Sequence, residues 1–232
     1  MVVEMKGTKS TGIDGISMKL IKQYFPYIET AMLKLVNQSI LLKRFPQSLK
    51  RSKIVPILKQ GKNSGECGSY RPINLLPSLS NIIEKSVFSQ LVRHLDERKI
   101  LPHNLHGSRA GHSTATALLD IQDRILDQAE QGRTTAILAL DNSSAYDVVE
   151  HRILLNKLKL IGLDDEAINW MESYLGGRSQ QVDVEGFRSP PLMHPPCSVI
   201  QGSIGSCLLY AIYTADLPLV LHSAHPRHSP ED

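Results

Sequence analysis

The sequence predicts an α+β fold for this chain of 232 residues. Several segments carry apolar residues every three or four positions, which is typical of helices with one buried face. Others are short runs of apolar and β-branched residues bounded by Gly-, Pro- or Ser-rich stretches, which is typical of strands. Hydrophobic residues make up 41% of the chain, so it can bury a core of one or two domains.

The first half is expected to hold two helices on either side of a strand. A helix is predicted over 28–43, where apolar residues follow the helical period, and Pro46 comes after its end. A strand is predicted over 53–59, followed by a Gly-, Ser- and Asn-rich loop over 60–69. The helical period returns over 79–98, which predicts a second helix.

The middle of the chain is expected to place a buried strand between two helices. The first helix is marked by the periodic residues Leu118, Ile121, Ile125 and Ala129. An uncharged, mostly apolar run then leads into Asp141 and predicts a strand over 134–141. A second helix is predicted over 150–161, and Gly162 suits the position after a helix end.

The last part predicts helix, strand and helix. The acidic run 164–166 favours a helix start, because the helix dipole stabilises negative charge there. A strand is predicted over 179–185, and a helix over 203–216 that Pro218 closes. Residues 222–232 are rich in His, Pro and Ser, which is typical of disorder.

Charge is divided unevenly along the chain. Residues 1–113 hold 18 Lys and Arg against 7 Asp and Glu, a net charge of +11. Residues 114–232 hold 8 against 16, a net charge of −8. This division favours a basic element for a polyanion beside an acidic element for metal. Two solvated faces that neutralise each other are the alternative, and the charges alone do not decide between them.

Cysteine usage and hydropathy indicate an intracellular protein, nuclear or cytoplasmic. Cys67, Cys197 and Cys207 are odd in number and scattered, so they predict neither a disulfide framework nor a zinc site. No apolar run reaches transmembrane length, and the N-terminus does not read as a secretory signal. We therefore expect no membrane partner.

Asp141 is the residue most suggestive of chemistry. A strand that delivers a carboxylate at its C-terminal end can hold a hard divalent cation such as Mg²⁺. A lone Asp after an apolar strand is more often a turn former or a helix N-cap. The choice between the two depends on the rest of the chain.

Five segments follow one another in an informative order. They are residues 8–17; 53–59 followed by Ser69-Tyr-Arg-Pro-Ile-Asn-Leu-Leu76; 105–114; 141–147 with His151; and Val199-Ile-Gln-Gly-Ser203, with 208–210 and 216–218 behind it. Together, over about residues 7–218, they resemble the reverse transcriptases of non-LTR (LINE-type) retrotransposons. The resemblance implies a partial right-hand polymerase: fingers, and an incomplete palm whose antiparallel sheet packs on helices. It divides the chain into a fingers-like region 1–113, a partial palm 114–218 and a disordered tail 219–232.

The resemblance gives Asp141 and Tyr146 roles at a polymerase site. Asp141 is implied as a catalytic residue and as a ligand of two Mg²⁺ ions, which would activate the primer 3′-hydroxyl and steady the pyrophosphate leaving group. Tyr146 matches the aromatic residue that packs beneath the sugar and excludes a 2′-hydroxyl. Its residue type alone also fits a core aromatic.

Four more residues are implied to bind the incoming dNTP. Lys59 and Arg71 match fingers residues that hold its triphosphate, Arg through a planar fork and Lys as a point charge. Without the resemblance they would be solvated surface cations. Gln201 and Gly202 match the segment beside the nascent base pair, where glycine lets the backbone approach a nucleotide. Without it they would be a turn before a helix.

The sequence departs from the family after this point. Family members continue into a hairpin with an aromatic-x-Asp-Asp signature that supplies the remaining metal ligand, whereas the acids after Gln201 here are Asp216, Glu231 and Asp232. Cys207 also stands where a proline is common. We therefore expect a chain truncated before the active site is complete and inactive as a polymerase alone. Its palm sheet should keep an unpaired edge and an uncovered apolar face.

Two functions from different classes remain in view. The first is a fragment of an RNA-directed DNA polymerase whose longer parent uses an RNA template, a DNA primer and dNTPs. The second is a non-catalytic nucleic-acid-binding remnant or a domesticated interaction module.

Overall fold

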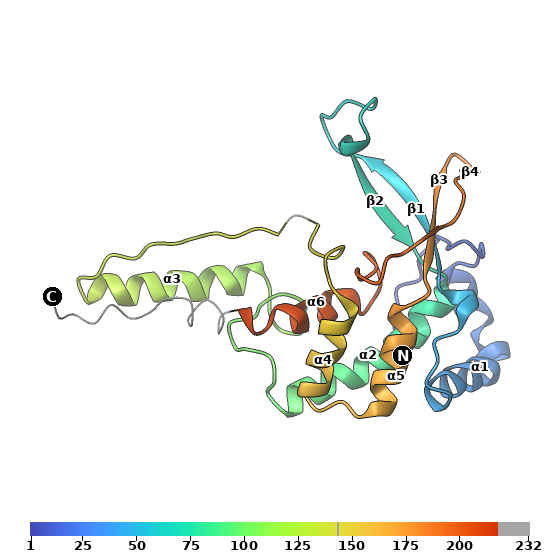
Figure 1. Cartoon of the computed structure of the whole chain (residues 1–232), viewed down its shortest axis with the longest axis horizontal. Coiled ribbons are helices and arrows are strands. Elements are labelled where there is room, and N and C mark those ends of the chain that lie inside the picture. Colours follow the sequence, from blue (N-terminus) through green and yellow to red (C-terminus); the bar gives the residue numbers. More distant parts are fainter. Residues whose placement is uncertain (143, 218–232) are drawn as a thin grey trace.

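A computed structural model of the chain describes residues 1–142 and 144–217 (Figure 1). Its elements run in the order α1 (Met18–Leu41), the 3₁₀ helix η1 (Gln47–Leu49), β1 (Arg51–Leu58), the 3₁₀ helix η2 (Cys67–Ser69), β2 (Tyr70–Leu75), α2 (Ser78–Glu97), α3 (Thr114–Glu130), α4 (His151–Leu160), α5 (Asp165–Leu175), β3 (Ser179–Val184), β4 (Phe187–Arg188), β5 (Leu192–Met193) and α6 (Ser206–Thr214). This order confirms an α+β fold.

Most predicted elements are present, and two helices begin three or more residues from the predicted position. Helix α1 begins at Met18 rather than at residue 28, because the Ser17 hydroxyl caps it by accepting a hydrogen bond from the Leu20 amide at 3.2 Å. Helix α6 begins at Ser206 rather than at residue 203, because Ile200–Ser203 forms a turn, closed by a 3.1 Å bond from the Ser203 amide to the Ile200 carbonyl.

Two helix-end predictions were correct in detail. The Asp164 carboxylate caps α5 by accepting from the Ala167 amide at 2.8 Å. Gly162 follows α4 with a φ of +92°, a conformation that L side chains rarely adopt.

The sheet is mixed: β3, β4 and β5 of the predicted palm pair antiparallel, as expected, but β3 also pairs in parallel with β1, which was not expected. Its order is β2-β1-β3-β4, with β5 also paired to β3. β1 and β2 are antiparallel, with Lys53 opposite Leu75, whereas β1 and β3 are parallel, with Arg51 opposite Ser179. The loop 59–69 reverses the chain between β1 and β2, but the path to β3 passes through several helices and can return in the same direction.

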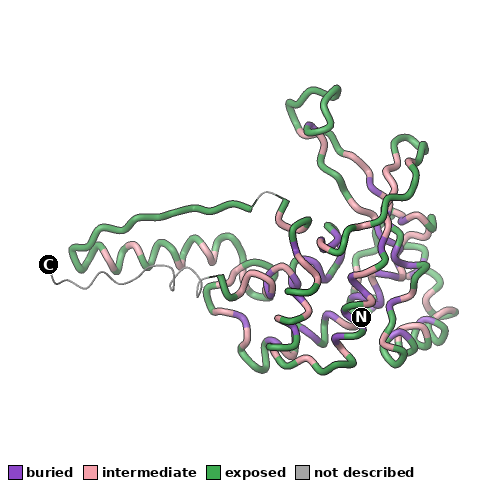
Figure 2. Tube along the Cα trace, viewed as in Figure 1, coloured by how far each residue is buried: buried purple, intermediate pink, exposed green. Residues whose placement is uncertain are grey.

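The main core lies where α2, α4, α5 and α6 meet. Leu154 on α4, Tyr174 on α5 and Leu209 on α6 belong to one buried cluster with α2 residues such as Ile83. The Phe45 ring lies edge-on to the rings of Trp170 and Tyr174 at 5.7 and 5.3 Å. Figure 2 shows this buried region in the body of the molecule. The core therefore joins residues from both sides of the 113/114 division, which itself stays a prediction.

Residues 134–141 do not form the predicted strand. They are extended, and within the described part of the chain no strand pairs with them. Ile137, Leu138 and Leu140 are 66, 82 and 69% exposed. Figure 1 shows α3 projecting from the body and this segment running back from its far end, and Figure 2 shows both largely exposed. A β-capable sequence becomes a strand only where a neighbour accepts its backbone hydrogen bonds, and none is in place here.

Two expectations concern the ends and the surroundings of the chain. The predicted tail 219–232 lies outside the described residues. Among the helices that the structure does describe, none has the length and apolar character needed to cross a membrane.

Candidate active site

Three segments that are far apart in sequence meet beside the start of α6. They are the end of β2, residues 144–149 and residues 197–207. The Val199 amide donates to the Tyr146 carbonyl at 2.8 Å, and the Ser198 amide donates to the Val149 carbonyl at 2.8 Å. Gly202 lies against β2, because a Cβ built on it would be 3.0 Å from the Asn74 carbonyl oxygen. Two predicted site residues, Tyr146 and Gly202, are thus held by one framework.

Asp141 is exposed on the segment that leads into this framework. Its neighbour Asn142 donates from Nδ2 to the Tyr210 hydroxyl at 2.9 Å, which ties the chain beside Asp141 to α6. The carboxylate itself makes no hydrogen bond or ion pair within the described residues. Asp141 is therefore available to a ligand, but the predicted strand does not hold it in place.

Tyr146 is half-buried, with its ring toward α6. The ring lies edge-on to Tyr210 at 5.6 Å, and the hydroxyl lies 3.1 Å from the Cys207 sulfur. The hydrogen bond to Cys207, and then partial burial, raise the pKa of the Tyr146 phenol to about 12. Tyr146 also packs against the main core, while its hydroxyl contacts Cys207 at the start of α6.

Gln201 and Gly202 form the exposed part of the turn before α6. Gly202 has a φ of +94°, which favours glycine, and its close approach to Asn74 leaves little room for a side chain. The following Ser203 is buried, and its hydroxyl accepts from the Tyr174 hydroxyl at 3.0 Å. Gln201 and Gly202 are thus exposed to solvent, while the buried Ser203 anchors the turn through its hydrogen bond to Tyr174.

Two buried ionisable residues near this turn, Glu84 and Arg178, were not predicted from the sequence. Glu84 is fully buried, and its carboxylate accepts from the Ser80 hydroxyl at 2.8 Å and from the Ile204 amide at 2.9 Å. Burial raises the pKa of Glu84, while nearby Arg178, itself 2% exposed, acts in the opposite direction. The spacing in the sequence could have indicated that Glu84 is buried, because Ser80 and Glu84 lie on the same face of α2 as the apolar Phe88.

Lys59 and Arg71 lie on the β1–β2 hairpin, which projects from the body (Figure 1). The Lys59 ammonium donates to the Gly68 carbonyl at 2.9 Å, so it also closes the 60–69 loop. Arg71 is exposed on β2 opposite Ile57, and its guanidinium makes no hydrogen bond or ion pair to any described residue. Both cations are accessible to an anionic ligand.

The described residues do not complete a two-metal centre. They contain no group of three or more His, Cys, Asp or Glu that could hold a metal ion. Two closely spaced divalent cations repel each other and need several oxygen ligands. Asp141 can supply one ligand but does not fit such a pair of ions alone.

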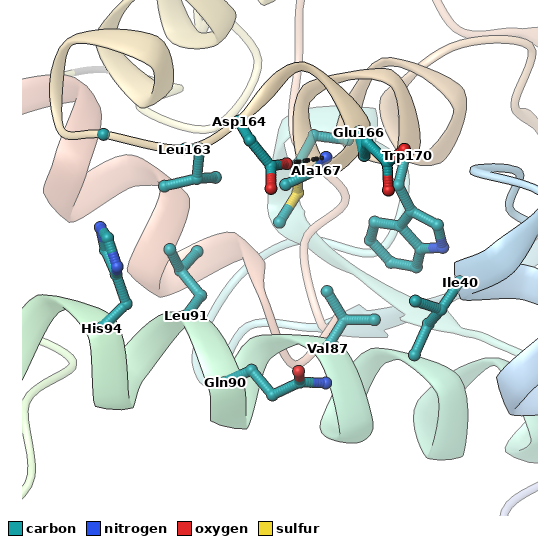
Figure 3. Close-up of a pocket in the computed structure, with 12 residues that line it drawn as sticks. Ile40, Val87, Gln90, Leu91, His94, Leu163, Asp164, Glu166, Ala167 and Trp170 are labelled. Atoms are coloured by element: carbon teal, nitrogen blue, oxygen red, sulfur yellow. Dashed lines mark hydrogen bonds between the residues drawn. The ribbon is translucent and has the colours of Figure 1, made fainter.

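A separate cavity of about 360 Å³ lies between α1, α2 and α5 (Figure 3). Its wall includes the apolar side chains of Ile40, Leu91 and Trp170, with Asp164 at the start of α5. The described residues that line it include none of the predicted site residues. We therefore assign it no part in the site.

Comparisons with known proteins agree with the family that the sequence resembles. The profile of one family, described as "Reverse transcriptase (RNA-dependent DNA polymerase)", matches residues 57–228. The chain is 34% identical over 222 residues to "Probable RNA-directed DNA polymerase from transposon BS" of Drosophila melanogaster, covering 94% of this chain and 24% of that protein. It is 31% identical over 219 residues to "RNA-directed DNA polymerase from mobile element jockey" of Drosophila funebris, with the same shares. The chain thus spans about a quarter of the length of these curated relatives.

Proposed function

Since this chain belongs to the reverse transcriptase (RNA-dependent DNA polymerase) family, we propose that it is the fingers and first part of the palm of a non-LTR retrotransposon polymerase. In the longer protein this part would bind an RNA template, a DNA primer and an incoming dNTP. The relatives named for RNA-directed DNA polymerase activity support this proposal, as does the alignment over 94% of the chain.

One observation carries the proposal on the structural side. The bond from the Val199 amide to the Tyr146 carbonyl and the contact of Gly202 with Asn74 bring together the three motifs for which a shared nucleotide site is proposed. A surface that served only to bind a polyanion would need no such convergence of uncharged residues.

The residues fit defined roles toward a nucleotide. Arg71 and Lys59 would hold the triphosphate, because both are accessible cations on the projecting hairpin. Gly202 would let the backbone approach the base and sugar. Tyr146 would offer its ring edge to the sugar, where a bulky group excludes a 2′-hydroxyl. This arrangement positions a substrate and leaves the charge of the triphosphate to be balanced by cations.

Divalent metal is the cofactor expected of the family, and we propose Mg²⁺. Such ions, when bound, lower the pKa of the attacking hydroxyl and neutralise charge on the leaving pyrophosphate. Asp141 is the proposed ligand in this chain. Because the described residues hold no group of three or more His, Cys, Asp or Glu that could bind a metal ion, we derive no catalytic step for the chain alone.

Primer extension tests the proposal. The chain alone, given an RNA template, a DNA primer, dNTPs and Mg²⁺ or Mn²⁺, should incorporate no nucleotide. A chimaera in which residues 1–217 replace the matching part of the jockey polymerase should extend the primer, and D141N should abolish that extension. Incorporation by the chain alone that D141N abolishes would refute the predicted inactivity. A folded chimaera that binds the primer–template but is inactive would refute the polymerase assignment.

The uneven distribution of charge along the chain supports a second candidate function. A net charge of +11 over residues 1–113 suits a non-catalytic nucleic-acid-binding remnant. An inactive chimaera that still binds nucleic acid is the result expected of that function.

A further inference from the structure

A fully buried carboxylate on α2 contacts the segment that follows the Gln201–Gly202 turn. Glu84 accepts from the Ser80 hydroxyl through Oε1 at 2.8 Å and from the Ile204 amide through Oε2 at 2.9 Å. A buried carboxylate is costly unless hydrogen bonds and an opposite charge compensate it. Glu84 therefore does more here than fill space, because an apolar residue would occupy the same volume at lower cost.

A buried cation, Arg178, lies near enough to Glu84 to act on its ionisation. Arg178 follows α5, is 2% exposed, and donates from Nε to the Tyr174 carbonyl. Its guanidinium lies over the Tyr174 ring at 4.3 Å and over the Phe45 ring at 5.0 Å. These contacts fix the guanidinium within the core, where its positive charge lowers the pKa of the Glu84 carboxyl and opposes the larger effect of burial.

The same contacts fix the start of α6. The Tyr174 hydroxyl donates to the Ser203 hydroxyl at 3.0 Å, and that oxygen accepts from the Ser206 amide at 3.1 Å. The first turn of α6 carries no acidic residue of its own. The Glu84 carboxyl on α2 supplies an acceptor there for the Ile204 amide, which no acidic residue of α6 itself provides.

We propose that Glu84 is a positioning residue for the Gln201–Gly202 turn. Its carboxyl oxygen fixes the Ile204 amide and, through the buried Ser203, the backbone of the exposed Gln201 and Gly202. Because Glu84 is fully buried, it does not reach a substrate itself. The proposal rests on the proposed function, since the turn must be held still only if it lies beside a bound nucleotide.

Hydrogen exchange of single amides tests the positioning role in the full chain. E84M with R178M removes the acceptor together with the nearby buried cation, so that Arg178 is not left in the core without the Glu84 carboxyl. E84Q keeps an oxygen for the Ile204 amide. Exchange at Ile204 should rise about tenfold or more in E84M/R178M, the effect expected from losing one charge-assisted hydrogen bond, and should change little in E84Q. The reference amide is Ile168, which bonds to the Asp164 carbonyl at 3.0 Å within α5.

Two results of the hydrogen-exchange experiment would contradict the positioning role of Glu84. An Ile204 amide that is unprotected in the unsubstituted chain overturns the proposal, whether or not the variants fold. So does an Ile204 amide in E84M/R178M whose exchange changes only as much as that of Ile168, because Glu84 would then act on overall stability alone.

A second readout separates this role from the proposed function. Addition of dTTP with Mg²⁺ should shift the NMR signal of the Gly202 amide in the unsubstituted chain and in E84Q, but not in E84M/R178M at the same concentration. An equal shift in E84M/R178M would overturn the positioning role. No shift in the unsubstituted chain would refute the nucleotide site, while the exchange comparison would still decide what Glu84 does.

Discussion

The Tyr146 hydroxyl lies 3.1 Å from the sulfur of Cys207, a residue 61 positions later in the chain. The contact joins Tyr146 to the first turn of α6, where a thiol can accept or donate a weak hydrogen bond. It therefore couples the ring proposed to contact the sugar to an exposed side chain on α6.

Replacing Cys207 should change the ionisation of Tyr146. C207A removes the hydrogen bond to Cys207, which is the main cause of the raised pKa of the Tyr146 phenol. That pKa should therefore fall from about 12 toward the ordinary value of ~10. The difference in tyrosinate absorbance between the unsubstituted chain and C207A, followed as pH rises, measures it, and Y146F identifies the signal. Identical titration curves for the two chains would contradict the assigned contact.

The same pair predicts a pH dependence of stability. With its pKa raised in the folded state, Tyr146 keeps its proton at a pH where the unfolded chain has lost it. Its contribution is complete below the unfolded pKa of ~10 and is lost as pH rises to about 12. The unfolding midpoint of C207A should therefore depend less steeply on pH in this window than that of the unsubstituted chain.

Gly205→Ala should destabilise the fold by overfilling the core beneath the turn. A Cβ at position 205 would lie 2.1 Å from Cζ and 2.2 Å from Cε2 of the buried Phe88 ring. Overpacking of this kind costs ~1–3 kcal/mol of unfolding free energy. Urea denaturation measures it, with G68A as the matched control because nothing lies within 4 Å of a Cβ there. Equal midpoints for G205A and G68A would show that Phe88 does not occupy this space.

Leu138→Lys should leave stability nearly unchanged, although the sequence predicts a buried strand at that position. Leu138 is 82% exposed, and such surface changes stay within ~0.5 kcal/mol. L154A, at a fully buried position of α4, should cost ~2–5 kcal/mol. Thermal unfolding of the two variants distinguishes them. A loss in L138K similar to that in L154A would mean that residues 134–141 are packed in solution.

Nucleic-acid binding should be electrostatic and led by the first half of the chain. Affinity for an RNA–DNA duplex should fall steeply as salt rises, because phosphate neutralisation releases counterions. R71A with K59A should weaken binding and reduce the salt slope, since each lost phosphate contact removes ~0.9 from it. Fluorescence anisotropy over a salt series is the measurement.

R152A with R188A is the control, because both are exposed arginines of the acidic half. Salt-independent binding, or equal losses in the two double variants, would count against the prediction.

The sequence by itself determined the family, most of the elements and several of their ends. Helical spacing located α2 and α4, and local chemistry located the start of α5 at Asp164 and the end of α4 at Gly162. These features depend on neighbours within a few residues, so a reading of the sequence captures them. The order of the motifs likewise identified Asp141, Tyr146 and Gly202 as candidates before their positions were known.

Only the tertiary structure decided which of these residues are held together and by what. The parallel pairing of β1 with β3, the contact of Tyr146 with Cys207, and the Glu84–Ile204 bond each join positions far apart in the chain. Residues 134–141 show the limit most plainly, because their β-capable sequence is the same whether or not a neighbouring strand is present. A strand and a buried carboxyl are stabilised by partners, and where the partners lie is settled by packing rather than by local sequence.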